Sequence, residues 1–279
     1  MEIRITTLSE NTADQGYLAE WGLSMFIEAD GAKVLFDTGA GIAAVHNAQL
    51  FGIDLATVDR IVISHGHRDH TGGLREVLMR MKKEVEVIAH PDIWAAKYSR
   101  RGKRPEQFSG LPFRQELLEN LGARFNMTRE PVHITDRFFT TGEIPMLSTY
   151  EEIDSGLFDK ETGEMLPDEL KDDLALVIDA EYGLVVILGC AHHGIINTLK
   201  HAQKLAGKKL IYAAIGGTHL LNASRERLEK TTADLKAMGV QYLGVSHCTG
   251  FEASAYLARE FGEGFFMNNS GGRFTLPFK

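Results

Sequence analysis

The sequence predicts an α/β fold, because short apolar runs rich in β-branched residues alternate along the chain with segments of helical periodicity. The chain has 279 residues, of which 44% are hydrophobic, and this is enough for a large buried core. No Ser-, Pro- or Gly-rich linker and no low-complexity tract interrupts the alternation. We therefore expect residues 1–279 to form a single domain.

Antiparallel strands are expected in the first forty residues. The runs IRITTL, LSMFIEA and KVLFDTG are separated by turns, and the Ala-Asp-Gly sequence at 29–31 is typical of a tight turn between two strands. From residue 60 the pattern changes, because the short run RIVIS ends in a polar turn and is followed by GLREVLMRMKK, which has helical spacing. The run VEVIA at 85–89 is expected to continue the sheet.

The segment 97–116 interrupts this alternation with basic and turn-forming residues, which predicts a surface loop or lid. Strands are expected again at 131–135 (PVHIT), 137–142 (RFFTTG), 174–180 (LALVIDA) and 184–189 (LVVILG). Three strand-then-helix units then close the sequence.

In each of these three units the strand ends in a histidine at the turn into the next helix, namely His192, His219 or His247. The earlier run RIVISHGH has the same arrangement and makes a fourth unit. Open α/β sheets bind ligands at the carboxyl ends of their strands. We therefore expect the four strand ends to converge on one pocket.

The run SHGHRDH at 64–70 crowds three histidines and an aspartate together. Alternate residues of an extended segment point the same way, so His65 and His67 can face one point. If a helix begins there, Asp69 and His70 lie on its first turn and can face a second point. So many protonatable groups in a short stretch are unfavourable unless a cation compensates them. The cluster therefore predicts the beginnings of two metal sites.

Imidazoles and a carboxylate suit two divalent metal ions, with Zn preferred and Mn or Fe as the alternatives. The cluster alone supplies too few ligands for two ions, and the three later strand-end histidines are the obvious further suppliers. The remaining isolated histidines are expected to be ordinary surface or core residues. These are His46, His90, His133 and His201.

These motifs carry a resemblance to a known family. SHGHRDH matches the HxHxDH signature of the metallo-β-lactamase superfamily, and VLFDTG upstream resembles the strand that precedes that signature. The segments GLSMFIE, TTGEIP, GCAHHGIINTL, GGTHL and SHCTG further resemble a subgroup described as dihydropterin ribofuranosylaminobenzene 5'-phosphate synthase-like. The likeness spans nearly the whole chain. It implies an αββα sandwich, with two mixed sheets between helices and a metal site at one edge.

The resemblance also implies roles for individual residues. The six ligands are His65, His67 and His192 for one metal and Asp69, His70 and His247 for the other. Asp37 has the position of a recurring aspartate, which would orient a ligating imidazole by accepting its other N–H. His219 could also be a ligand, but we expect it to be a pocket residue that binds substrate or stabilises charge.

One position departs from the family's pattern. Many members carry a bridging aspartate after a strand-end glycine, where this chain has Cys190. The third histidine also follows that strand here, whereas many relatives supply it from an earlier loop. A metal could bind Cys190 as a thiolate and so lower the pKa of the thiol, or the residue could be a small buried thiol. Cys248 allows similar interpretations, and both cysteines are expected to be reduced.

The function that these features predict is that of a metal-dependent hydrolase. A metal pair lowers the pKa of a bound water, and the resulting hydroxide can attack a polarised carbonyl or phosphoryl group. Asp69 would orient this hydroxide in addition to binding metal. His193 or His219 could protonate the leaving group.

Basic residues in the segment 97–116 give the only direct indication of a substrate. They are Arg100, Arg101, Lys103 and Arg104, and they are flanked by Tyr98 and Phe108. A lid that presents such groups could bind a small phosphorylated or otherwise anionic molecule, with the aromatic side chains stacking on a ring. The alternative is an ordinary solvated loop.

Two other functions are open at the level of sequence. The subgroup resemblance implies a pterin-related transferase, in which the metals would activate a diphosphate leaving group. The third hypothesis is a noncatalytic metal-binding or sensor protein that keeps the scaffold, and the apparently complete set of ligands weakens it.

Composition limits the partners. The formal net charge of -8 argues against a nucleic-acid partner, because phosphate backbones are held mainly by dense basic surfaces. The amino terminus has no basic stretch followed by an apolar one, and the chain has no uncharged apolar segment of about 18 residues. We therefore expect a cytoplasmic protein with a small-molecule substrate and no membrane partner, and the oligomeric state is open.

Overall fold

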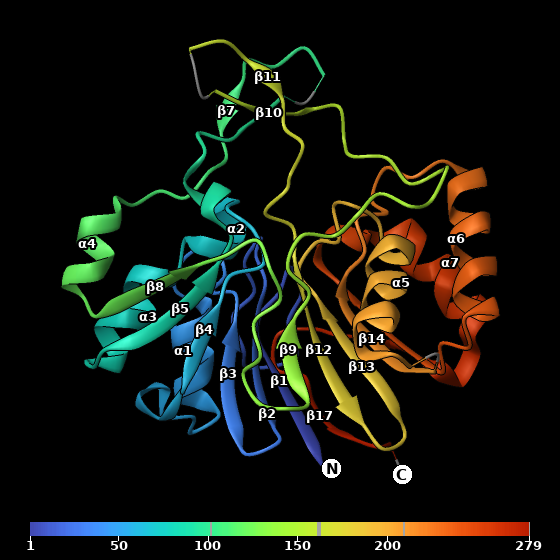
Figure 1. The fold of residues 1–279 in the computed structure, drawn as a ribbon, viewed down its shortest axis with the longest axis horizontal. Helices are drawn as coiled ribbons and strands as arrows, with labels where there is room; N and C mark the ends of the chain where they lie inside the picture. The colour runs from blue at the N-terminus through green and yellow to red at the C-terminus, as the bar shows by residue number, and fades with distance from the viewer. Residues whose placement is uncertain (101, 161–162, 209, 279) are drawn as a thin grey trace.

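Two mixed β-sheets pack face to face in the computed structural model, which describes residues 1–100, 102–160, 163–208 and 210–278 (Figure 1). The strand order in the first sheet is β17 (Arg273–Leu276), β1 (Ile3–Ser9), β2 (Ser24–Ala29), β3 (Ala32–Phe36), β4 (Arg60–Val62), β5 (Val85–Ala89) and β8 (Ala123–Met127). The order in the second sheet is β16 (Phe265–Met267), β15 (Tyr242–Ser246), β14 (Ile211–Gly217), β13 (Gly183–Leu188), β12 (Ala175–Ala180) and β9 (Phe138–Thr140).

Helices cover the outer face of each sheet, on the left and on the right of Figure 1. Those of the amino-terminal half are α1 (Ala43–Leu50), α2 (Arg68–Thr71), α3 (Leu74–Met81) and α4 (Gln115–Asn120). Those of the carboxyl-terminal half are α5 (Ile195–Ala206), α6 (Arg225–Ala237) and α7 (Phe251–Phe261). Short 3₁₀ turns are η1 (Leu55–Thr57), η2 (Pro91–Trp94), η3 (His247–Thr249) and η4 (Gly262–Gly264). None of the helices within the described ranges combines the length and the apolar composition needed to cross a membrane.

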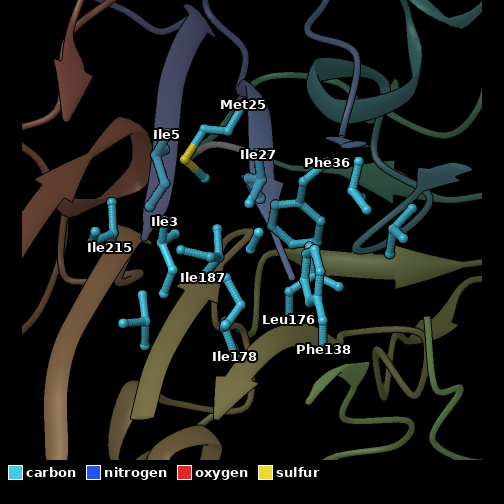
Figure 2. Close-up of a cluster of buried hydrophobic side chains, with 14 of the residues drawn as sticks. Ile3, Ile5, Met25, Ile27, Phe36, Phe138, Leu176, Ile178, Ile187 and Ile215 are labelled. Atoms are coloured by element: carbon cyan, nitrogen blue, oxygen red, sulfur yellow. The ribbon is translucent and has the colours of Figure 1, made fainter. Parts of the chain in front are cut away.

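The layers are thus helix, sheet, sheet and helix, which confirms the αββα sandwich. Its main core lies between the two sheets, where Ile27 and Phe36 of the first sheet face Leu176 and Ile187 of the second (Figure 2). Two further apolar clusters lie between each sheet and its helices. Strand β13 is buried at every position, because it has the core on one face and helices on the other, and this explains its unbroken apolar run.

Strand direction brings the candidate site together. Strands β13, β14 and β15 run parallel, so their carboxyl ends meet at one edge of the second sheet. The first sheet adds the carboxyl end of β4, which runs parallel to β3 and β5. The histidines that follow these strand ends therefore approach one another across the two sheets.

A small third sheet stands out above this edge, at the top of Figure 1. Its strand order is β11 (Leu166–Pro167), β10 (Leu157–Asp159), β6 (Tyr98–Ser99) and β7 (Gln107–Phe108). The segment 97–116 is therefore more than the loop or lid expected from sequence, because it contains β6 and β7 and the start of α4. Pairing of β6 with β10 ties this segment to residues that lie about sixty positions later.

The prediction of a strand at 131–135 is wrong. His133 forms only an isolated bridge with Phe139. The N–H groups of Ile134 and Thr135 both donate to the Phe138 carbonyl, at 2.8 and 3.0 Å, so the chain turns back immediately. Pro131 also lacks the N–H that a longer strand would need.

Candidate metal centre

His65 and His67 lie in the turn that joins β4 to α2. His67 has extended backbone angles (φ -67°, ψ 145°) and is the residue at which the helix begins. Gly66, between them, lies against Ile93, where an added Cβ would come within 2.6 Å of the Ile93 carbonyl oxygen. Only glycine therefore lets this turn approach the neighbouring backbone so closely.

The first group of possible ligand atoms comes from this turn and from the end of β13. His65 Nε2 lies 3.2 Å from His192 Nε2. The His67 ring packs edge-on against both rings, with centroid distances of 4.7 and 4.9 Å. His67 Nε2 and His192 Nδ1 are buried without a hydrogen-bond partner among the described residues. Because buried polar atoms normally have partners, this group fits a cation.

The second group comes from α2 and from the end of β15. His70 Nε2 lies 3.3 Å from His247 Nε2, which in turn lies 3.3 Å from Asp69 Oδ2. The Trp21 indole N–H donates to the same Asp69 oxygen at 3.0 Å. Two imidazole nitrogens and a carboxylate oxygen thus face one point from two different sheets.

Cys190 lies between the two groups. Its sulfur is 3.2 Å from His70 Nε2. The same sulfur lies within 4.8 Å of the ligand atoms of His65 and His192, and of those of His70 and His247. The side chain is buried, and burial raises the pKa of its thiol well above the usual value. A buried thiolate at this position needs a neighbouring cation, and an ion in either group would supply one.

Hydrogen bonds orient these imidazoles. The Asp37 carboxylate lies 2.6 Å from His70 Nδ1 and accepts the Ser64 hydroxyl at 2.7 Å. The Ser64 oxygen lies 2.9 Å from His65 Nδ1, and the Asn11 side-chain oxygen lies 2.9 Å from His247 Nδ1. If each Nδ1 carries the proton in these bonds, each Nε2 presents a lone pair toward the centre, as metal coordination requires.

Several residues of this edge have left-handed backbone angles, which residues other than glycine rarely adopt. They are Asp37 (φ 57°), Ala191 (φ 51°), His219 (φ 49°) and His247 (φ 53°). Such conformations cost free energy and persist only where surrounding contacts enforce them, most often at functional sites. The backbone strain therefore lies at the candidate ligand His247 and at residues beside the other candidate ligands.

Burial keeps the first group neutral. It is the main cause that lowers the pKa of His65 and of His192 well below the usual value, and neighbouring histidines lower both further. Burial also lowers the pKa of His67 to about 3. Neutral imidazoles are the form that binds metal, so this group is ready to coordinate an ion at neutral pH.

The second group holds a proton when no ion is bound. Burial lowers the pKa of His70, but the Asp37 carboxylate outweighs it and raises the pKa to about 9. Burial raises the pKa of Asp69, but hydrogen bonding to His247 and the charge of His70 outweigh it and lower the pKa. An ion that binds His70 Nε2 would displace this proton, so we expect metal uptake here to release protons.

A cavity of about 740 Å³ opens over the centre. His67, Asp69, His192 and His247 line it together with Cys190. The volume is in the range of pockets for small molecules.

His219 lines the same cavity, and its ring centroid is 4.2 Å from that of His192. Its Nδ1 is buried without a partner among the described residues, and its Nε2 lies 3.9 Å from the Asp154 carboxylate. Burial lowers the pKa of His219, but Cys248 and Asp154 outweigh it and raise the pKa. His219 is therefore beside the centre and facing the cavity.

Comparison with known proteins agrees with this geometry. The family model described as the metallo-β-lactamase superfamily matches residues 22–202. The chain belongs to the metallo-β-lactamase superfamily. It is 33% identical, over 96% of its length and 95% of the relative, to a Methanocaldococcus jannaschii protein named 7,8-dihydropterin-6-methyl-4-(beta-D-ribofuranosyl)-aminobenzene-5'-phosphate synthase.

Solved structures give the same family. One described as a metal-dependent hydrolase of the β-lactamase superfamily has a TM-score of 0.82 and 29% identity, with 98% of each chain covered. A diphosphatase from the PhnP family has a TM-score of 0.54 and 14% identity, with 99% of this chain and 98% of that one covered, which supports the fold alone. Within this metallo-β-lactamase fold, the chain brings all six expected ligands together at one edge.

His193 does not face the centre, which argues against its expected role as a proton donor. Its Nδ1 lies 2.5 Å from the Ile144 carbonyl oxygen and its Nε2 lies 2.8 Å from that of Glu169. Both ring nitrogens are thus occupied by backbone oxygens. His90 and His201 also pair away from the centre, with Glu143 and with the Thr141 carbonyl.

The basic segment contributes less to the cavity than expected. Arg100 lines it, while Lys103 and Arg104 are exposed in a turn and are not among its lining residues. Arg101 lies outside the described residues. The expected substrate-binding role of Lys103 and Arg104 therefore lacks structural support, because the turn carries their side chains into solvent.

Several residues of the site are missed by sequence reasoning. Trp21 and Arg227 line the cavity, and Lys97, Asp168 and Asp172 form a buried ion-pair group beside Gly66. The position of Arg227 in a charged helix predicts a solvated surface residue. Lys97 has no local motif, since its partners lie about seventy residues later. Only pairing information between distant segments could have identified it.

Proposed function

We propose that this chain is a metal-dependent hydrolase of small anionic substrates. The observation that carries the proposal is the meeting of two histidine-rich groups at Cys190, under an open cavity. Bound divalent ions, most simply two Zn ions, would supply a water of lowered pKa at this point. Membership in a superfamily with metal-dependent hydrolases of known structure supports the same reaction class.

The surrounding residues have complementary roles in this proposal. The Trp21 indole holds the Asp69 carboxylate at the cavity wall, where it can orient the attacking water. The His219 ring faces the cavity beside His192 and can protonate the leaving group. Asp37, which contacts His70 and Ser64 but not the cavity, acts as a positioning residue.

Metal analysis combined with activity measurements tests this function. Substrates would include a phosphomonoester, a phosphodiester, a diphosphate and a lactone. We expect the double variant His65→Ala/His67→Ala to lose bound metal and at least about a hundredfold in activity, because electrostatic stabilisation at the reacting centre is lost. The exposed His46→Ala is the matched control and should keep both.

Activity of the double variant at wild-type level without metal would contradict a metal-dependent reaction. A wild-type protein that binds two ions and turns over no substrate would instead favour the noncatalytic or sensor hypothesis.

The relative named as a synthase favours one second candidate, a pterin-related transferase. In such a reaction a dihydropterin methyl diphosphate would be joined to an aminobenzene ribotide with loss of diphosphate. The same centre would then activate a leaving group.

Product analysis with both substrates separates the two candidates. A joined product that contains both rings would establish the transferase. Release of diphosphate without a joined product would eliminate it and leave hydrolysis.

A further inference from the structure

Arg227 presents an unpaired edge of its guanidinium group at the cavity. The residue lies in the first turn of α6, and it lines the cavity together with the preceding Leu221, Asn222 and Ala223. One nitrogen, Nη1, donates to the Glu152 carbonyl at 3.3 Å. The other two, Nε and Nη2, are buried and have no hydrogen-bond partner among the described residues.

The two unpaired nitrogens form one edge of the guanidinium, along which two N–H bonds run in parallel. This is the edge that binds two oxygens of a carboxylate or a phosphate at once. Because Nη1 is held by the backbone of Glu152, the edge is already oriented. Little further ordering is then needed for an anion to bind.

No carboxylate within the described ranges pairs with Arg227. Its basic neighbours on α6 do have partners, since Arg225 pairs with Glu229 and Lys230 pairs with Glu226. The nearby Glu151 carboxylate interacts electrostatically with Arg227 but forms no hydrogen bond with it, because it accepts the N–H groups of Ile196 and Asn197 at the start of α5. A guanidinium is charged throughout the pH range of folded proteins, so a buried unpaired edge is unfavourable until an anion occupies it.

Arg100, the other cavity arginine, differs in this respect. Its guanidinium pairs with Glu106 and lies 4.9 Å from the centroid of the Phe158 ring. Its side chain is also 44% exposed, so its charge is already screened by a partner and by water. Arg227 is therefore the stronger of the two anion-binding groups.

We propose that the Nε–Nη2 edge of Arg227 binds a phosphate group of the substrate that is not the reacting group. This proposal rests on the proposed function, because the reacting group would lie at the candidate metal centre, where His67 and Asp69 line the same cavity. The substrate class is thus a phosphorylated small molecule whose phosphate is retained in the product. A carboxylate offers the same pair of oxygens and is the alternative source of the anion.

Binding of phenylphosphonate, a phosphate mimic that has a C–P bond in place of a phosphoester bond, tests this assignment. We expect Arg227→Gln to raise the dissociation constant of phenylphosphonate at least about tenfold in the metal-loaded protein, because a bidentate charge-assisted contact is lost. Calorimetry measures this constant. Arg227→Lys should give an intermediate loss, since it keeps the charge and lacks the paired N–H bonds. Arg225→Gln, on the same helical turn, is the matched control and should change the constant less than about twofold.

The double variant His65→Ala/His67→Ala separates this site from the metal centre. Phenylphosphonate binding that persists there and still depends on Arg227 supports the proposal, even if every hydrolase assay fails. Binding that is lost with the metal and is insensitive to Arg227→Gln overturns it. Tighter binding of benzoate than of phenylphosphonate at the Arg227 site would overturn the assignment to phosphate. If Arg227→Gln fails to fold, the Arg227→Lys measurement decides between these outcomes.

Discussion

Cys190 differs in chemistry from the other candidate ligands. A thiolate is a softer donor than an imidazole or a carboxylate, and it favours Zn over Mg or Ca. The sulfur lies near atoms of both ligand groups, where a single side chain can contact two ions. Cys190 follows the end of β13 and immediately precedes Ala191, whose backbone has a left-handed conformation.

Replacing Cys190 tests whether the sulfur is a ligand. We expect Cys190→Ser to weaken metal binding at least about tenfold, because the softest donor of the centre is removed. Protein reconstituted with Co²⁺ should also lose the thiolate-to-metal charge-transfer absorption. Cys248→Ser, at the neighbouring buried cysteine, is the control and should retain this absorption. The opposite pattern in the two variants would show that Cys190 is only a packed thiol.

At the scale of secondary-structure elements, the small sheet is anchored beside the metal centre. Lys97 precedes β6, and its Nζ lies 2.9 Å from both Asp168 Oδ2 and Asp172 Oδ1. Asp172 also accepts the Gly66 N–H at 2.7 Å, between the two histidines of the first group. The ion pairs therefore connect the base of the small sheet to the turn that carries His65 and His67.

We expect Lys97→Met to lower the free energy of unfolding by about 3 to 5 kcal/mol, because two buried carboxylates lose their counter-charge. Urea unfolding of the metal-loaded protein measures this change. Lys103→Met, in the exposed turn of the same segment, should stay within about 0.5 kcal/mol of the wild type. Equal stability of the two variants would contradict a structural role for the buried ion pairs.

Sequence reasoning pointed to residues that the structure brings together where candidate ligands lie close together in the chain or recur after similar strands. SHGHRDH carries four candidate ligands in one turn, and the later histidines each follow a strand. Arg227 and Lys97 were not predicted, because their importance depends on what lies across the cavity or seventy residues away. The strand expected at 131–135 failed for a related reason, since the turn back to Phe138 overrides its local β propensity.

At the scale of the whole molecule, the candidate metal centre joins the two halves of the sandwich. His65 and His70 belong to the first half, and His192 and His247 belong to the second. Bound ions would therefore cross-link the two sheets at this edge. Their binding free energy adds to the stability of the folded chain.

Removal of metal by a chelator should accordingly lower the midpoint of thermal unfolding, and added Zn should restore it. At a free-ion concentration a hundred times the dissociation constant, ion binding at one site raises the free energy of unfolding by about 2.7 kcal/mol. The variant His65→Ala/His67→Ala should respond much less to either treatment. An unchanged midpoint after metal loss, verified by elemental analysis, would contradict a stabilising centre.

The pairing of β1 with β17 has a consequence for synthesis on the ribosome. Ile3 lies opposite Leu276, so the outer edge of β1 has no partner until the final strand has been translated. An open strand edge can pair with other chains, and contacts between such distant residues form slowly. We therefore expect closure of this edge to be a late step of folding, and the nascent chain to depend on protection of β1 until then.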